Sequence, residues 1–162
     1  MKEDDKFVFF WQGGDIYSNF YQSNFYLYNK EFSSAEQCFM YSKAIHFQDF
    51  QIAKQILKTH EPMNCKNLGR KVKNYNEKEW NILREEKMFQ ACFAKFAQNE
   101  GLKEKLINTS NKILVEASPN DKIWGVGLRE DDTEILNPYN WRGQNLLGKV
   151  LMKVREIIKE MH

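Results

Sequence analysis

The chain has 162 residues, of which 42% are hydrophobic and 14% aromatic, and its formal net charge is +2. This length predicts a single domain over residues 1–162, and the apolar content excludes a disordered chain. The lysine-rich stretches alternate with glutamate, a pattern typical of solvated helix faces and not of a basic nucleic-acid groove.

The three cysteines, Cys38, Cys65 and Cys92, are far apart in the sequence and odd in number. Their spacing fits neither a metal site nor a disulfide framework. No signal peptide and no apolar run of transmembrane length is present. We therefore expect a cytoplasmic protein without metal, cofactor or membrane partner.

The first predicted elements are rich in aromatic residues. Residues 6–11 are aromatic and β-branched, which predicts a strand. An irregular aromatic loop is expected at 17–21, after a glycine turn. Apolar arms on both sides of Asn29-Lys30 predict a hairpin with its turn at these two residues.

Helical periodicity and capping signals predict the rest of the architecture. Residues 112–117 form the best strand of the second half. Together the elements predict an α+β fold, a mostly helical single domain with a small β-sheet. The expected helices cover about 33–47, 49–58, 63–70, 77–98 and 102–107, and a last one begins at Gln144 or Asn145.

Glu36 and Lys43 stand seven residues apart within the first long helix. Seven residues make almost two turns, so both side chains project from one face, about 10 Å apart along the axis. Helical ion pairs form at spacings of three or four residues, which disfavours a simple surface pair. A carboxylate and an amine on an otherwise apolar stripe favour a cleft wall that carries an acid/base and an amine nucleophile.

Structural explanations for both residues remain open at this point. Ser33-x-x-Glu36 is a capping box, in which the Ser33 hydroxyl accepts from the Glu36 amide and Glu36 reaches back. Lys43 could place its stem along the core and its amine in water.

A second unusual stretch follows the strand at 112–117. Glu116 lies near the strand end, Asp121 follows a proline, and Trp124 precedes Gly125. Loops at strand ends often carry sites, and glycine lets a flat ring or a ribose approach the backbone closely. The structural alternative is that Asp121 caps a turn and Trp124 fills the core.

Several well-known catalytic motifs are missing from the sequence. It has no phosphate-binding loop, no dinucleotide-binding glycine pattern, no zinc-protease motif and no nucleophile elbow. Catalysis would have to rely on carboxylates, lysine and aromatic side chains, without metal.

Taken together and in order, the motifs resemble the NADAR family, also called the YbiA-like family. The resemblance covers nearly the whole chain, and the N-terminal strand and the loop at 129–140 are individual to this chain. The matching pieces are Ser18-Asn19-Phe20-Tyr21, Glu36-Gln37-x-x-Met40-x-x-Lys43-Ala44, Leu68-Gly69-Arg70, Trp80, Lys87-Met88, Lys95-Phe96, Asn99, Glu116-Ala117-Ser118-Pro119-x-Asp121-x-x-Trp124-Gly125-x-Gly127-Leu128 and Trp141-x-Gly143-x-Asn145-x-Leu147-Gly148-x-x-Leu151-Met152-x-x-Arg155.

The resemblance implies an N-glycosidase that hydrolyses the C1′–N bond of a ribosylated base. One implied substrate is ADP-ribosylated guanine, as a nucleoside or in nucleic acid. The other is a phosphoribosylated aminopyrimidine of riboflavin synthesis. A non-catalytic module that binds ADP-ribose or NAD is the alternative from another functional class.

The resemblance also implies roles for individual residues. Lys43 is the candidate nucleophile, which forms a Schiff base with the ring-opened sugar and must be neutral to do so. Glu36 and Asp121 are the candidate carboxylates for acid/base steps. The expected substrate-binding residues are Asn19 and Arg70 for ribose and phosphate, Trp124 and Gly125 for the flat ring, Asn145 as an anion site at a helix start, and, less firmly, Glu116.

Overall fold

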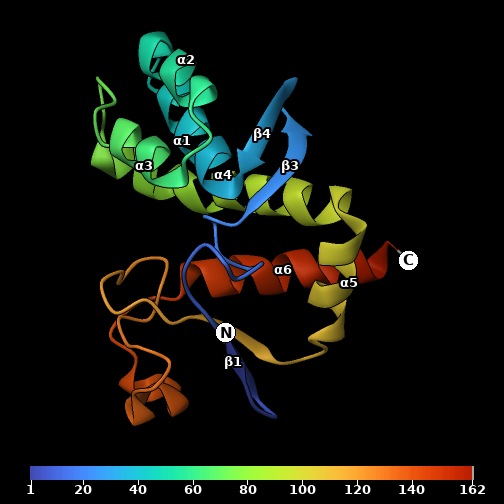
Figure 1. Ribbon diagram of the computed structural model, residues 1–162. Coiled ribbons are helices and arrows are strands. Elements are labelled where there is room, and N and C mark those ends of the chain that lie inside the picture. Colours follow the sequence, from blue (N-terminus) through green and yellow to red (C-terminus); the bar gives the residue numbers. More distant parts are fainter. Residues whose placement is uncertain (162) are drawn as a thin grey trace. The chain divides into compact units, whose positions relative to one another are not determined.

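The computed structural model describes residues 1–161, which form two compact units (Figure 1). Unit 2 comprises Asn19–Asn99. Unit 1 comprises Met1–Ser18 and the segment that begins at Glu100. Unit 2 is thus inserted in the sequence between the two parts of unit 1.

Unit 1 contains a three-stranded sheet in the order β1-β2-β5. β1 (Lys2–Glu3) is antiparallel to β2 (Phe7–Phe10), which pairs in parallel with β5 (Ile113–Glu116) from Phe7↔Ile113 to Phe10↔Glu116. All four residues of β2 are buried, which suits the central strand of a sheet. The strands predicted at 6–11 and 112–117 are confirmed, with shorter bounds.

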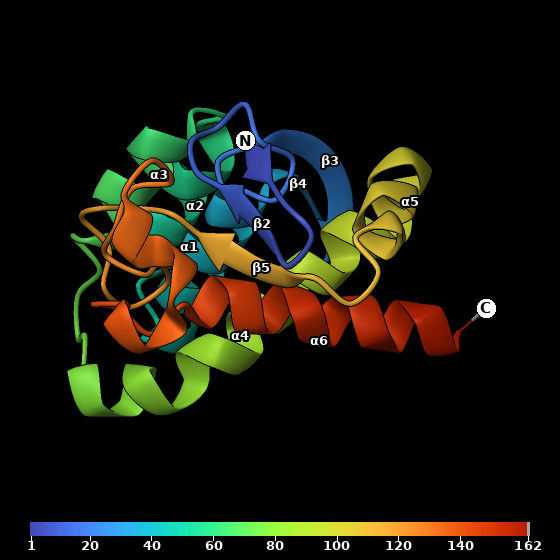
Figure 2. The same cartoon turned by 90° about the horizontal axis from the view of Figure 1, so that it is seen from below.

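The helices of unit 1 are α5 (Glu100–Asn108) and α6 (Leu146–Glu160). Figure 2 shows α6 running along β5. The buried Arg155 of α6 donates from Nη1 to Thr109 Oγ1 at 2.9 Å and to the Lys112 carbonyl at 2.8 Å. These bonds fix α6 to the segment that leads into β5.

Between β5 and α6 the chain forms a long connection with two short 3₁₀ helices, η1 (Thr133–Leu136) and η2 (Pro138–Asn140). This connection is not only a surface loop, because part of it enters the apolar core of unit 1. One buried cluster of that core comprises Phe7, Phe9, Val115, Ala117, Val126, Leu128 and Ile135.

Unit 2 begins with a hairpin of β3 (Gln22–Leu27) and β4 (Lys30–Ser34). The hairpin was predicted and is confirmed, but its turn lies one residue earlier than expected. Tyr28 and Asn29 adopt φ of 56° and 60°, as a two-residue type I′ turn requires, and Lys30 already pairs with Leu27. β3 packs against the long helix α4 (Glu77–Gln98) (Figure 1).

The other helices of unit 2 are α1 (Ala35–His46), α2 (Phe50–Lys58) and α3 (Pro62–Gly69), and α1 packs against α2, α3 and α4. A side chain caps the start of both α2 and α4. Asp49 Oδ1 accepts from the Ile52 amide at 3.1 Å, and Asn76 Oδ1 accepts from the Glu79 amide at 2.9 Å.

The fold is therefore α+β and mostly helical, as expected, although its strands form two small sheets instead of one. The prediction of a single domain over 1–162 stays a prediction. None of the helices in the described part of the chain combines the length and the apolar character that a bilayer crossing requires.

Candidate functional site

The start of α1 differs from the predicted capping box by one residue. Ser34 Oγ accepts from the Gln37 amide at 3.1 Å, and Gln37 Oε1 accepts from the Ser33 amide at 2.8 Å. The box is therefore Ser34-x-x-Gln37, and the expected pairing of Ser33 with Glu36 is wrong. The cap thus gives no structural reason for a carboxylate at position 36.

The backbone amide of Glu36 bonds to a loop and not to a cap. It donates to the carbonyl of Asn19 at 3.0 Å, which holds the loop before β3 against the first turn of α1. Both residues are buried, and the Cys92 thiol contacts Asn19 Oδ1 at 3.9 Å. The structure therefore places two predicted site residues, Asn19 and Glu36, next to each other.

Lys43 lies further along α1 and is partly buried. Burial lowers the pKa of its amine below the ordinary value of 10.5, the Glu36 carboxylate acts in the opposite direction, and the Arg70 guanidinium lowers the pKa further. The net direction is downward, because loss of hydration disfavours the charged form. A lowered pKa is what an amine nucleophile needs.

Arg70 reaches this region because α3 packs closely on α1. A Cβ on Gly69, the last residue of α3, would lie 2.0 Å from Met40 Sδ, so only glycine fits without a shift of the methionine. Arg70 follows directly, is exposed, and donates from Nη1 to Asn67 Oδ1 at 3.4 Å. Within the Leu68-Gly69-Arg70 motif, the glycine thus allows close packing on Met40, and the arginine supplies a positive charge.

Sequence reasoning missed Tyr75, which lies beside Lys43. The Lys43 Nζ stands over its ring, 4.5 Å from the centroid. It also missed the bond of 2.6 Å between His46 Nε2 and Glu79 Oε1, although His46 is one turn after Lys43. Neither pairing has a local signal, because the partners are more than 30 residues apart.

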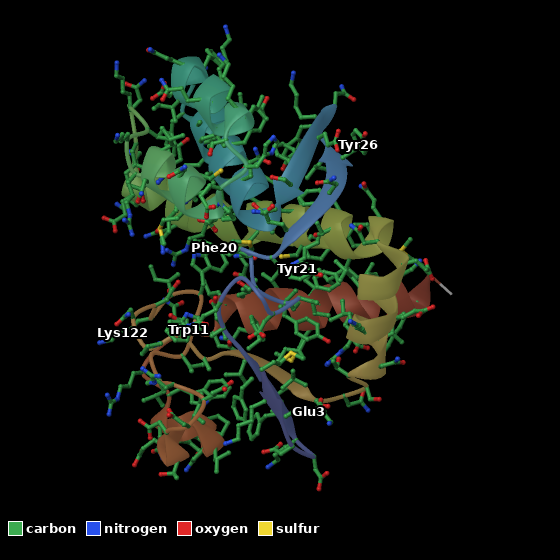
Figure 3. All side chains as sticks on the ribbon, viewed as in Figure 1. Glu3, Trp11, Phe20, Tyr21, Tyr26 and Lys122 are labelled. Atoms are coloured by element: carbon green, nitrogen blue, oxygen red, sulfur yellow. The ribbon has the colours of Figure 1, made fainter. Side chains whose placement is uncertain are left out.

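In unit 1, Asp121 caps a turn. Its Oδ1 accepts from the amides of Ile123 at 2.9 Å and Trp124 at 2.8 Å. This bonding agrees with the structural alternative for Asp121 and fixes the orientation of its carboxylate. Trp124 is only partly buried and does not fill the core, and Figure 3 shows Lys122 on this same loop.

Gly125 is buried where the loop folds onto the end of β5. A Cβ there would lie 2.9 Å from the Asp121 carbonyl oxygen and 3.0 Å from that of Glu116. The Val126 amide donates to the same Glu116 carbonyl at 3.0 Å. Glycine is therefore required here because the chain's own carbonyl oxygens lie close to this position, and not because the position forms an open surface for a ligand.

Asn145 connects the start of α6 to β5. It has the left-handed φ of 53°, its Nδ2 donates to the Leu114 carbonyl at 3.0 Å, and its Oδ1 accepts from the Glu116 amide at 3.0 Å. The amides of residues 145, 146 and 147 donate to the carbonyls of Gly125, Ile123 and Trp124. Three of the amides that an anion at this helix start would use are therefore already bound by loop carbonyls.

The nine predicted site residues thus fall into two groups. Unit 2 holds Asn19, Glu36, Lys43 and Arg70, and unit 1 holds Glu116, Asp121, Trp124, Gly125 and Asn145. Their assignment to a site stays a prediction. Within residues 1–161, no cluster of three or more His, Cys, Asp or Glu side chains could hold a metal ion.

A cavity of about 270 Å³ lies elsewhere in unit 1. None of the nine predicted residues lines it. Its walls are Met1, Trp11, Gln12, Gly14, Asp15, Arg129, Glu130 and Asp131.

Comparison with known proteins gives a consistent picture. The sequence model of the NADAR domain matches residues 9–159. The chain is similar to Protein irg-1 of Caenorhabditis elegans, with 43% identity over 93% of this chain and 78% of the relative. It is also similar to N-glycosidase R617 of Acanthamoeba polyphaga mimivirus, with 41% identity over 95% of this chain and 97% of the relative.

A solved structure supports the fold as well. The NMR structure of the Escherichia coli protein YbiA superposes with a TM-score of 0.80 at 28% identity. The match covers 99% of this chain and 89% of that one. The resemblance to the NADAR family is therefore confirmed, and the roles of the individual residues stay predictions.

Proposed function

Because the chain belongs to the NADAR domain family, we propose that it is an N-glycosidase, a hydrolase that cleaves the C1′–N bond of a ribosylated base. Relatives that match over nearly the whole chain are named N-glycosidases, which supports this class of reaction. The observation that carries the proposal is the group formed by Glu36, Lys43 and Arg70. The charges of Glu36 and Arg70 both act on the pKa of the Lys43 amine within unit 2.

The proposed chemistry uses the Lys43 amine as nucleophile. As the ring opens, the C1′–O4′ bond breaks, the amine attacks C1′, and O4′ takes one proton of the amine. The C1′–N bond to the base then breaks, the base leaves with a proton from a carboxylic acid, and a protonated imine between Nζ and C1′ remains. Water adds to C1′, its oxygen becomes the aldehyde oxygen of the released ribose, and its two protons go to Nζ and to the carboxylate.

Glu36 is the proposed proton donor and acceptor. It is buried at the start of the same helix, and its carboxylate interacts with the Lys43 amine. Asp121 stays the proposed second carboxylate for protonation, with Oδ1 held by two amides. The proposed substrate contacts are those of Asn19 and Arg70 with ribose and phosphate, and of Trp124 with the base.

Both candidate substrates carry phosphate groups, and the segment that contains Arg70 is locally basic. Residues 62–76 contain Lys66, Arg70, Lys71 and Lys73 and no acidic residue, although the whole chain has a net charge of only +2. The chain-wide alternation of charge therefore does not hold in this segment. Part of this charge is offset by Asp49, whose Oδ2 accepts from the Lys73 amide at 2.9 Å.

We propose ADP-ribosylated guanine, as a nucleoside or in nucleic acid, as the first substrate to test, and phosphoribosylated aminopyrimidine as the second. A basic segment favours the substrate with more phosphates. A cytoplasmic location is part of the same proposal, since Cys38, Cys65 and Cys92 are free thiols, as is usual in a reducing compartment.

Product analysis by mass spectrometry tests the function. The wild-type protein and Lys43→Ala would each be incubated with an ADP-ribosylated guanine oligonucleotide and, separately, with the aminopyrimidine ribosyl phosphate. Free ADP-ribose from the first, absent with Lys43→Ala, supports the nucleic-acid reaction. Ribose phosphate released from the second substrate, with no product from the first, would instead indicate a role in metabolite clearance.

The same experiment addresses the alternative of a non-catalytic ADP-ribose or NAD-binding module. Tight binding of ADP-ribose without turnover of either substrate would contradict the N-glycosidase function and support the binding module. Borohydride trapping tests the covalent step separately. A sugar adduct that still forms on Lys43→Ala would refute the role of Lys43.

A further inference from the structure

Tyr75 lies beside the proposed nucleophile, and neither the motifs nor the proposed function assign it a role. The Lys43 Nζ lies over the face of its ring, 4.5 Å from the centroid. This distance is well inside the range of a cation–π contact. The two residues come from α1 and from the connection between α3 and α4.

The ring is fixed by a second aromatic residue. Phe47, one turn after Lys43, packs edge-on against Tyr75 with centroids 5.5 Å apart and an interplanar angle of 66°. Phe47 itself contacts His46 at 4.8 Å and Trp80 at 6.1 Å. The tyrosine therefore rests on a buried aromatic cluster, although 44% of its own surface is exposed.

The backbone on the N-terminal side of Tyr75 is anchored as well. The Lys73 amide donates to Asp49 Oδ2 at 2.9 Å, and Val72 is buried. Asn74 adopts the left-handed φ of 61° and donates from Nδ2 to the Phe47 carbonyl at 3.5 Å. A left-handed asparagine held by such bonds directs the next residue to a defined place.

We propose that Tyr75 is a positioning residue for the Lys43 amine, whose Nζ its ring face holds in place for attack on the sugar carbon. The proposal rests on the proposed function, because it assigns Tyr75 to the same reaction. A flexible lysine stem has many rotamers, and an aromatic face beside the amine restricts them without supplying a proton acceptor.

The experiment compares Tyr75→Leu with Tyr75→Phe. Leucine keeps much of the bulk that covers Lys43 but removes the π face, whereas phenylalanine keeps the face and removes only the hydroxyl. We expect Tyr75→Leu to lower the pH-independent kcat by up to about 30-fold with little change in KM, because the lysine stem regains the rotamer freedom that the ring restricts. Tyr75→Phe should stay within about 2-fold of the wild type.

A second readout does not depend on activity. The rate at which an amine-reactive reagent labels Lys43 reports the fraction of neutral amine at each pH. Removal of the ring face removes a contact that favours the ammonium form, so the labelling profile of Tyr75→Leu should move to lower pH. The two charged groups that act on the pKa of Lys43, Glu36 and Arg70, stay unchanged in this variant.

Tyr28 supplies a matched control within the same unit. It is 37% exposed, and the Lys87 Nζ lies 5.7 Å from its ring centroid. Tyr28→Leu should leave both the kcat and the labelling of Lys43 unchanged. If Tyr75→Leu fails to fold, Tyr75→Trp tests the same contact from the other side, since the stronger π face of tryptophan should move the labelling profile to higher pH.

Two results would overturn the proposal. One is a Tyr75→Leu variant that matches Tyr28→Leu in kcat and in the labelling of Lys43. The other is an equal loss in Tyr75→Phe, which would assign the effect to the hydroxyl. A wild-type protein without turnover or trapped adduct would instead count against the proposed function, and the labelling profile would still test the contact.

Discussion

Gly69 and Met40 are packed so closely that the Cβ of any other residue at position 69 would lie 2.0 Å from the methionine sulfur. This contact lies where α3 packs against α1, directly before Arg70, whose guanidinium lowers the pKa of Lys43.

Gly69→Ala is expected to destabilise the protein. The added methyl group must displace Met40 Sδ, which lies near the end of a flexible side chain, so we expect a loss of about 1 kcal/mol, the lower end of the range for overpacking. Met40→Ala in the same chain should recover part of that loss, because it removes the clashing sulfur. Denaturant unfolding of both single variants and the double variant measures the coupling.

Gly101→Ala is the control for this prediction. Gly101 lies in α5, and a Cβ there would meet nothing within 4 Å. The substitution should stabilise the protein by roughly 0.5–1 kcal/mol, because alanine is the better helix former. Equal effects of the two glycine substitutions would contradict the packing argument.

Opposite changes are expected in the pKa of Lys43 when its two charged neighbours are neutralised one at a time. Arg70→Gln removes a cation that lowers this pKa, so the pKa should rise and labelling of Lys43 should need higher pH. Glu36→Gln removes an anion that raises it, so the profile should move to lower pH. A shift in the same direction for both variants would disprove the electrostatic grouping.

The stability of the protein should rise with pH in a window set by Lys95. This residue is 1% exposed, and burial lowers the pKa of its amine from 10.5 to about 8. Between about pH 8 and 10.5 the unfolded chain holds more protons than the folded one, so the free energy of unfolding increases by up to about 3 kcal/mol. Below pH 8 the buried charge is present in full and its cost is constant.

Lys95→Met tests this dependence. The variant should lose most of the rise between pH 8 and 10 in denaturant titrations. Lys78→Met, an exposed position on the same helix, should keep it. An unchanged pH dependence in Lys95→Met would show that other groups cause the rise.

Asn145→Ala should destabilise unit 1, because it removes two hydrogen bonds to β5 and leaves a non-glycine residue in the left-handed region. We expect a loss of about 2–4 kcal/mol. Asn145→Gly loses the same bonds without the backbone strain, so it should be more stable than the alanine variant by about 1 kcal/mol. Thermal unfolding of both variants separates the two contributions.

The sequence predicted most element boundaries within two residues, because periodicity and caps are local signals. It could not choose between two adjacent serines, since Ser33 and Ser34 are each followed three residues later by a suitable partner, Glu36 or Gln37. The structure decides for Ser34, whose side chain is fully buried. Gln37, and not Glu36, is therefore the residue that pairs with the capping serine.

Contacts between distant segments account for what the sequence did not reveal. Tyr75 reaches Lys43 only through the packing of α3 and α4 on α1. The Asn145 amide reaches β5 only through the packing of α6. The prediction of a helix start near Asn145 was correct, but a local sequence signal cannot show that loop carbonyls already bind the backbone amides there.

The parallel pairing of β2 with β5 has a consequence for biosynthesis. The two strands are separated by more than 100 residues, and all of unit 2 is translated between them. A nascent chain therefore exposes the aromatic strand Phe7–Phe10 without its partner until β5 leaves the ribosome, while unit 2 already has its complete sequence. Chaperone binding during synthesis should concentrate on this first strand.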